Sequence, residues 1–170
     1  MHAYSGRRRP GDIQFFLENF HRENNDGSYV LHIVSMDIVI DQQYGDARNE
    51  DTRSYWLGAI RDRKVVAFVA GPPCETWTAA REHKLDNGRG GPRPVRSADE
   101  LWGFVSMQLR ELCQVCVGNE LLIFALQAFI ELLFSGGCGL LEHPAPPPKL
   151  TSPSIWKLPV IQALQKHPAV

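Results

Sequence analysis

The sequence has little of what marks several specialised classes of protein. The formal net charge of its 170 residues is −1 at pH 7, so the whole molecule exerts no strong attraction on nucleic acid or on a membrane surface. Its four cysteines lack the spacing of a disulfide framework, and the polar, basic N-terminus lacks the apolar core of a signal peptide. We therefore expect reduced thiols in an intracellular protein, with the nucleus a compatible location, and a single domain over residues 1–170.

A long hydrophobic run is also missing. The most apolar segment, Leu121 to Phe134, has 14 residues and is interrupted by Gln127 and Glu131. A membrane-spanning helix needs about 20 predominantly apolar residues. The segment therefore predicts a buried core helix, and we expect no membrane partner.

What the chain does contain is an alternation of strand-like and helix-like segments. A capping box, formed by Ser97 and Glu100, favours one or two long helices from residue 97 to residue 134. In the predicted helix over 9–24, an apolar face at helical spacing is formed by Ile13, Phe16, Leu17 and Phe20. We expect strands over 1–6, 29–41, 64–71 and 138–144, further helices over 49–60 and 154–167, and a Gly/Pro/Arg-rich loop over 83–96.

This alternation predicts an α/β fold with a parallel sheet and flanking helices. In such sheets, ligands bind beyond the carboxyl ends of the strands. Four chemically useful residues fall at or just after predicted strand ends, namely Gly6, Asp37, Cys74 and Glu142. We expect them to share one site.

Two short motifs carry a resemblance to a known family. The first is Gly71-Pro72-Pro73-Cys74, and the second is the Leu-Glu-His-Pro segment that contains Glu142. Together they resemble the DNA cytosine-5 methyltransferase family, and most closely methylase-like segments of protist mobile-element reading frames. The resemblance implies a Rossmann-like sheet, S-adenosylmethionine as cofactor, Cys74 as nucleophile and Glu142 as the acid that binds the base.

The same resemblance extends to the expected cofactor site. Ser5 and Gly6 look like the family's opening cofactor loop, Asp37 like the acidic residue that receives the ribose hydroxyls, and Asp46 like the residue that meets the adenine amine. Pro72 is expected to shape the loop beside the cofactor. The order of these elements along the chain matches the family's order.

The proposed chemistry explains why a thiol and a carboxyl group are needed. Carbon 5 of cytosine is a poor nucleophile until a thiolate adds to carbon 6. A free cysteine has a pKa near ~8.5, so it needs a helix N-terminus or a cation beside it. We expect the segment after Cys74 to begin a helix, with Arg81 as a candidate cation, and Glu142 to hydrogen-bond or protonate N3 of the ring.

Nucleic acid is the partner that the resemblance implies, with DNA favoured over RNA and the choice between them left open. Trp77 is a candidate for stacking on an extruded base. The basic residues of the 83–96 loop are candidates for contacting the backbone, namely Arg89, Arg93 and Arg96.

Several alternatives stay open at the level of sequence. Cys74 can equally be a small residue packed under a Gly-Pro-Pro turn. Cys113 and Cys116 share a helical face without a second ligand pair, which favours core packing over metal binding, and we expect no metal site.

The chain also departs from the family. His143 stands where an asparagine follows the family's glutamate, and no Gln-x-Arg-x-Arg element follows. We therefore expect a partial methyltransferase domain lacking its C-terminal strands. The alternative function is an inactive methylase fold that serves as a nucleic-acid-binding or assembly module of a mobile-element protein.

Overall fold

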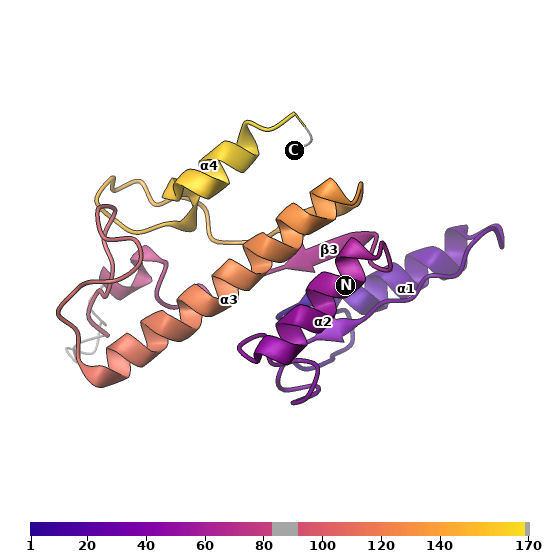
Figure 1. Cartoon of the computed structure of the whole chain (residues 1–170), viewed down its shortest axis with the longest axis horizontal. Helices are drawn as coiled ribbons and strands as arrows, with labels where there is room; N and C mark the ends of the chain where they lie inside the picture. The colour runs from indigo at the N-terminus through magenta and orange to yellow at the C-terminus, as the bar shows by residue number, and fades with distance from the viewer. Residues whose placement is uncertain (83–91, 169–170) are drawn as a thin grey trace. The chain divides into compact units, whose positions relative to one another are not determined.

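The computed structural model of the chain describes residues 1–82 and 92–168 (Figure 1). The chain, expected from its length to form one domain, divides into two compact units. Unit 1 contains Met1–Gly71 and Phe124–Glu142, and unit 2 contains Pro72–Ile123 and His143–Val170. Each unit is therefore described by itself.

Unit 1 is built on a four-stranded sheet with the order β2-β1-β3-β4. Its strands are β1 (His2–Ala3), β2 (Ser35–Met36), β3 (Ala67–Ala70) and β4 (Cys138–Leu141). All three pairings between neighbouring strands are parallel. This confirms the α/β class and the parallel sheet with flanking helices.

The strand predicted over 29–41 is much shorter in the structure. Only Ser35–Met36 pairs as β2, whereas Val30 is 76% exposed and the segment after Asp37 forms turns. The physical reason is that β2 lies at the sheet edge, with only the two-residue β1 as a partner. Apolar composition indicates β structure here, but strand length depends on the neighbour available for pairing.

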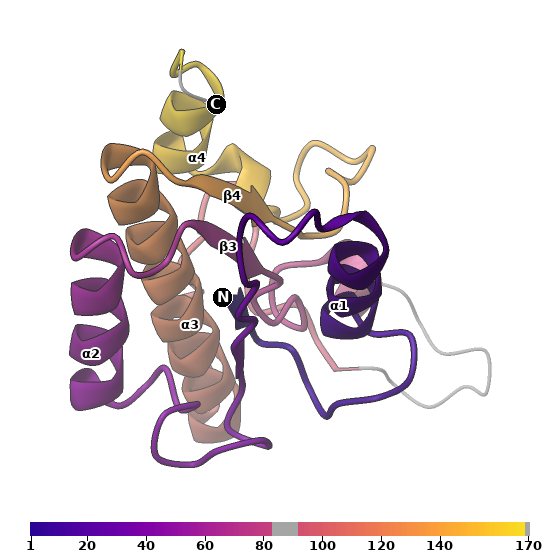
Figure 2. The same cartoon turned by 90° about the vertical axis from the view of Figure 1, so that its right-hand side faces the viewer.

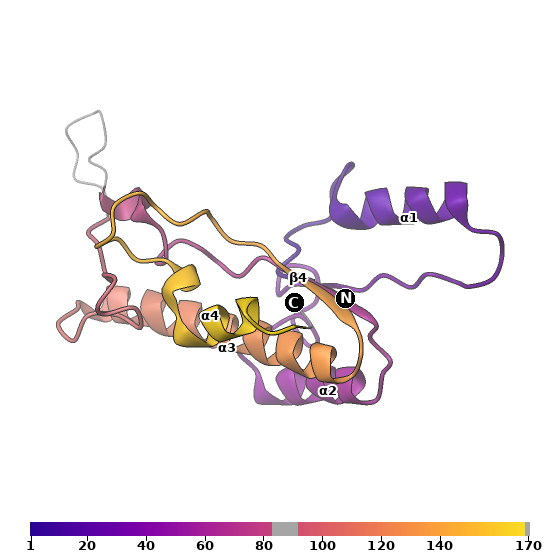
Figure 3. The ribbon, with the colours of Figure 1, turned by 90° about the horizontal axis from the view of Figure 1, so that it is seen from above.

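The helices of unit 1 lie on opposite faces of the sheet (Figures 2 and 3). Helix α1 (Ile13–Asn24) is on one face, whereas α2 (Glu50–Arg61) and the C-terminal half of α3 (Leu109–Phe134) are on the other. The order of the strands explains this arrangement. The chain passes from β1 to β2 in one direction across the sheet, and from β2 to β3 and then β4 in the opposite direction. Right-handed crossovers then place their helices on opposite faces.

The core of unit 1 lies between the sheet and the helices α2 and α3. Phe68 and Ala70 of β3 are fully buried, as are Ile60 of α2 and Leu132 of α3. A Cβ added to Gly139 of β4 would lie 2.7 Å from the ring of Phe129, so the glycine allows α3 to approach the strand closely. Arg61 and Glu131 link the two helices at the surface through an ion pair of 2.7 Å.

Helix α1 forms as predicted but does not bury its apolar face. Asp12 caps it by accepting a hydrogen bond from the Phe15 amide. The structure describes every residue of α1, and none of its side chains is buried. The apolar face formed by Ile13, Phe16, Leu17 and Phe20 is exposed by 40% to 63%. The helical spacing is therefore present, but the apolar face is not covered.

Helix α3 is the core helix predicted over Leu121 to Phe134, but it begins earlier, at Leu109. By length and composition alone its 26 residues are apolar enough to cross a membrane, and half of its most apolar window is buried within the protein. The long helix predicted from Ser97 is wrong before residue 109. Ser97 does accept a hydrogen bond from the Glu100 amide, but turns and Gly103, with φ of +116°, follow.

The described residues of unit 2 contain little regular structure besides the N-terminal half of α3. Their other helical elements are η1 (Ala79–Glu82), η2 (Ile155–Lys157) and α4 (Pro159–Gln165). The terminal helix predicted over 154–167 is thus divided in two. The interior of unit 2 includes Trp77, Val115, Leu122, Ile155 and Leu158, each no more than 2% exposed.

Candidate functional site

The four strands of unit 1 end in register. Ala3 is paired with Met36 and with Ala70, and Ala70 is paired with Leu141. The residue that follows each strand therefore leaves the sheet at the same carboxyl edge. These residues are Tyr4, Asp37, Gly71 and Glu142. The sheet thus brings three of the sequence-predicted segments together, at the edge where ligands of α/β proteins bind.

Asp37 ties the loops after β1 and β2 to each other. Its carboxylate accepts a hydrogen bond of 2.9 Å from the Gly6 amide and one of 3.0 Å from the Val39 amide. Gly6 has φ of +66°, a conformation that glycine adopts without strain. The predicted pair Ser5-Gly6 and the predicted Asp37 are therefore direct neighbours.

Tyr4 precedes Ser5-Gly6 at this edge, and the resemblance matches it to the aromatic residue of the family's opening cofactor loop. Its φ of +60° is rare for a residue other than glycine, and such conformations concentrate at functional sites. Burial raises the pKa of its phenol well above the usual range. The sequence signal was the aromatic residue directly before Ser5-Gly6, but no sequence rule indicates the left-handed backbone.

Asp46 lies after a tightly wound segment that begins at Asp37. A Cβ added to Gly45 would lie 2.1 Å from the Asp37 carbonyl oxygen, so only glycine fits. Both carboxylate oxygens of Asp46 accept hydrogen bonds of 2.8 Å from the Arg48 guanidinium. This pairing lowers the pKa of Asp46. The residue expected to meet an adenine amine is thus engaged with its own neighbour.

A hollow of about 370 Å³ lies between this segment and the start of α2. Tyr44 and Tyr55 contribute aromatic walls, with ring centroids 5.7 Å apart. The rest of the lining is polar and consists of Gln42, Gln43, Asn49, Asp51 and Thr52. Aromatic walls with amide, hydroxyl and carboxylate groups suit a flat, polar ligand.

Glu142 directly follows β4 and lies beside the end of β3. Its amide donates a hydrogen bond of 2.8 Å to the Ala70 carbonyl, which continues the ladder by one residue. Its Oε2 would be 3.0 Å from a Cβ at Gly71. The carboxylate therefore occupies the space that the absence of a side chain at Gly71 leaves open.

The Pro-Pro-Cys segment belongs to unit 2. Pro72 is buried, and Cys74 is a half-buried free thiol. The Trp77 amide donates to the Cys74 carbonyl, which closes a turn. The helix expected after Cys74 is only the short η1, so no helix N-terminus follows the thiol directly. Arg81 donates to the Glu75 carbonyl and to the Gln114 side chain.

Trp77 and Arg96, expected to contact nucleic acid, are instead buried in unit 2. Each is 1% exposed, and the guanidinium carbon lies 3.8 Å from the indole centroid. Arg96 donates to neutral acceptors, namely Thr76, Asn119 and the carbonyls of Leu101 and Val115. Burial lowers the pKa of Arg96 to about 10. This corrects the expectation for both side chains, which have a structural role.

Of the other two arginines expected to contact nucleic acid, Arg93 and Arg89, the structure describes only Arg93. Arg93 is exposed and forms a two-pronged ion pair with Glu111 at 2.6 Å. This partner lowers the pKa of Glu111 to about 2. Arg89 lies outside the described residues.

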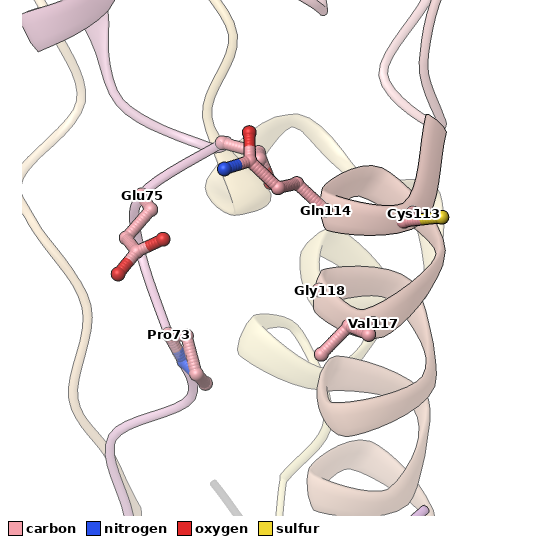
Figure 4. Close-up of a pocket in the computed structure, with 7 residues that line it drawn as sticks. Pro73, Glu75, Cys113, Gln114, Val117 and Gly118 are labelled. Atoms are coloured by element: carbon pink, nitrogen blue, oxygen red, sulfur yellow. The ribbon is translucent and has the colours of Figure 1, made fainter. Parts of the chain in front are cut away.

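Unit 2 has a hollow of its own, with a volume of about 350 Å³, beside the Pro-Pro-Cys segment (Figure 4). Pro73 and Glu75 form one wall, and α3 forms the other through Cys113, Gln114, Val117 and Gly118. A Cβ at Gly118 would approach Thr76 to 3.1 Å, so this helical glycine allows the loop to pack against α3.

Among the described residues, no group of three or more histidine, cysteine, aspartate or glutamate side chains is placed to hold a metal ion. No family model, curated protein or solved structure matches the chain.

Proposed function

We propose that unit 1 is the cofactor-binding part of an S-adenosylmethionine-dependent methyltransferase-like domain with a Rossmann-like sheet. The proposed reaction is methylation of cytosine carbon 5 in nucleic acid, with DNA as the favoured substrate. One observation carries the proposal. The strand ends are in register, so that the Ser5-Gly6 loop, Asp37 and Glu142 all lie along the carboxyl edge of a parallel sheet, the edge at which α/β proteins bind ligands.

The geometry supports a nucleoside-type cofactor at this edge. Asp37 already holds the Gly6 loop in place, and its oxygens retain lone pairs for ribose hydroxyls. The hollow lined by Tyr44 and Tyr55 has a volume in the range of small-molecule sites and offers an aromatic wall for an adenine ring. Because Arg48 engages Asp46, we assign contact with the adenine amine to the amide-lined hollow.

In the proposed reaction the Cys74 thiolate forms a bond to carbon 6 of the cytosine ring. A sulfonium cofactor, when bound, would supply a methyl group to the electron pair released at carbon 5 and would leave as a neutral thioether. Glu142, as a carboxylic acid, donates a hydrogen bond or a proton to N3 and stabilises the adduct. Loss of the carbon-5 proton to a base then expels the thiolate and restores the aromatic ring. The roles of Cys74 and Glu142 derive from the resemblance of their motifs.

Calorimetric titration of the purified chain with S-adenosylmethionine tests the cofactor site. We expect binding by the wild-type chain and loss of binding in Asp37→Ala and Tyr55→Ala. Tyr29→Ala is the matched control, because Tyr29 is a comparably exposed tyrosine outside the hollow. Absence of binding by a folded wild-type chain would refute the proposed cofactor site.

Covalent trapping on 5-fluorocytosine DNA in the presence of S-adenosylmethionine tests the nucleophile. Fluorine at carbon 5 blocks the final elimination, so the adduct persists and can be weighed by mass spectrometry. We expect an adduct with the wild-type chain and with Cys138→Ala, and none with Cys74→Ala. An adduct that survives Cys74→Ala would assign the chemistry to another residue.

Two ion pairs favour the alternative, an inactive methylase fold that serves as a nucleic-acid-binding or assembly module. Asp46 is paired with Arg48, and Arg93 with Glu111, so two groups expected in binding are engaged elsewhere. This alternative predicts no cofactor binding and no effect of Cys74→Ala on association with nucleic acid. The calorimetric titration therefore separates the two functions.

A further inference from the structure

Two thiols lie on one exposed face of α3. Cys113 and Cys116 are three residues apart in the helix, which places their Cβ atoms about 5–6 Å from each other. Both side chains are exposed and neither forms a disulfide. The expectation that this pair packs in the core is therefore wrong.

Core packing fails as an explanation because the helix turns a different face inward. Val115 and Gly118 are the buried residues of this stretch. In Figure 4 the sulfur of Cys113 points away from Pro73 and Glu75, toward the outer side of the helix. Free cysteine is among the residue types most often buried, so an exposed pair at this spacing calls for another reason.

We propose that Cys113 and Cys116 form a two-coordinate site for a soft monovalent ion, with Cu(I) as its chemical type. Soft thiolate ligands suit Cu(I), zinc and iron–sulfur clusters. A zinc–sulfur bond is about 2.3 Å long, and two metal–sulfur bonds of that length in a line place the sulfur atoms about 4.6 Å apart. Two cysteine side chains with Cβ atoms about 5–6 Å apart can reach this sulfur–sulfur distance. Zinc sites need about four ligands, and the described residues offer no group of three or more.

A nearby positive charge, that of Arg96, favours the net negative charge that a Cu(I) complex of Cys113 and Cys116 carries. Binding converts two thiols and one Cu(I) into a bis-thiolate complex of net charge −1 and releases two protons. The buried Arg96 guanidinium has no carboxylate partner among the described residues and interacts electrostatically with Cys116. The positive charge of Arg96 therefore offsets the net negative charge of the bound complex.

The test is a titration of the reduced chain with Cu(I) under anaerobic conditions, in competition with a coloured Cu(I) chelator. We expect a single Cu(I) per chain, and a loss of affinity of at least about tenfold in both Cys113→Ser and Cys116→Ser. Cys138→Ser is the matched control, because it removes an equally exposed free thiol of unit 1. Its affinity for Cu(I) should equal that of the wild-type chain.

Three results would overturn the site. Wild-type affinity in Cys113→Ser or Cys116→Ser would show that the pair does not hold the ion. An equal loss in Cys138→Ser would indicate non-specific thiol binding. Equal affinity for Zn²⁺ and Cu(I) would show that more ligands than two thiols are involved. Circular dichroism of each variant verifies that these exposed substitutions leave the fold intact.

Discussion

At the scale of single residues, His143 is the group with the clearest pH-dependent effect. It is 8% exposed and lies edge-to-face against Trp156, with ring centroids 6.5 Å apart. Burial lowers the pKa of His143 from 6.5 to about 4. The folded chain therefore keeps the imidazole neutral at a pH where the unfolded chain takes up a proton.

We expect His143 to reduce the stability of the chain as the pH falls. Between pH 6.5 and pH 4 only the unfolded state gains this proton, so the free energy of unfolding falls by about 1–3 kcal/mol through this residue. Urea unfolding of the wild type and of His143→Phe across this range checks it. The stability difference between the two proteins should change steadily below pH 6.5, and a constant difference would contradict the assignment.

Two glycines of unit 1 make a matched pair with opposite expected effects. A Cβ at Gly45 would lie 2.1 Å and 2.4 Å from the carbonyl oxygens of Asp37 and Asp41, whereas nothing lies within 4 Å of one at Gly58. Gly45→Ala should therefore destabilise the chain by about 1–3 kcal/mol, because backbone must shift. Gly58→Ala, inside α2, should stabilise it by up to about 1 kcal/mol. Both effects are measurable by urea unfolding, and equal effects would contradict the winding of residues 37–45.

The individual partners of charged residues could not be predicted from the sequence. A basic residue in a Gly/Pro-rich loop is normally solvated, so Arg96 was expected at the surface. It is instead enclosed by Trp77 and neutral acceptors that come from separate parts of the chain. Asp37 and Ser5-Gly6, by contrast, were found together as expected, because strand order alone brings strand ends to one edge.

At the scale of elements, α1 shows the limit of hydrophobic periodicity. The pattern predicted the helix itself, which follows its N-cap residue Asp12 in the structure. Periodicity identifies an apolar face but does not say what covers it, and Phe16 and Phe20 are 62% and 63% exposed.

This exposure gives a direct prediction for α1. Phe16→Ser and Phe20→Ser should each change the free energy of unfolding by no more than about 0.5 kcal/mol, because exposed positions contribute little and the two residue types have similar helix propensity. Phe68→Ala, at a fully buried position of β3, should cost about 3–5 kcal/mol. Urea unfolding of the three variants is the measurement. A large loss in either α1 variant would mean that this face packs in solution.

The strands and the long helix differ in how well their ends could be predicted. Strand β3 was found where the buried run predicted it, because Phe68 and Ala70 alternate toward the core. Strand β2 is shorter than its apolar run because pairing limits it. Helix α3 begins later than its capping signal, and a Cβ at Gly103 would lie 2.6 Å from the Val115 side chain. Local signals predict elements, but contacts distant in sequence set their ends.

At the scale of the whole molecule, the two units share one continuous element. Helix α3 contributes Leu109 to Ile123 to unit 2 and Phe124 to Phe134 to unit 1. The chain also passes from unit 1 to unit 2 at Gly71 and again at Glu142. Neither unit is therefore a contiguous stretch of sequence. Because each unit contains one part of α3, loss of structure in one unit unfolds a segment that is continuous with the helix of the other unit.

We expect this sharing to couple the stabilities of the two units. Leu132 is fully buried in unit 1, so Leu132→Ala should cost about 2–5 kcal/mol there. Because helix formation is cooperative along the chain, amides of α3 that lie in unit 2 should lose protection as well. Native-state hydrogen exchange over residues 115–121 and 124–134 measures both effects. Leu140→Ala, at a 59% exposed position of β4, should leave both regions nearly unchanged. Unchanged protection of residues 115–121 in Leu132→Ala would show instead that the two units unfold independently.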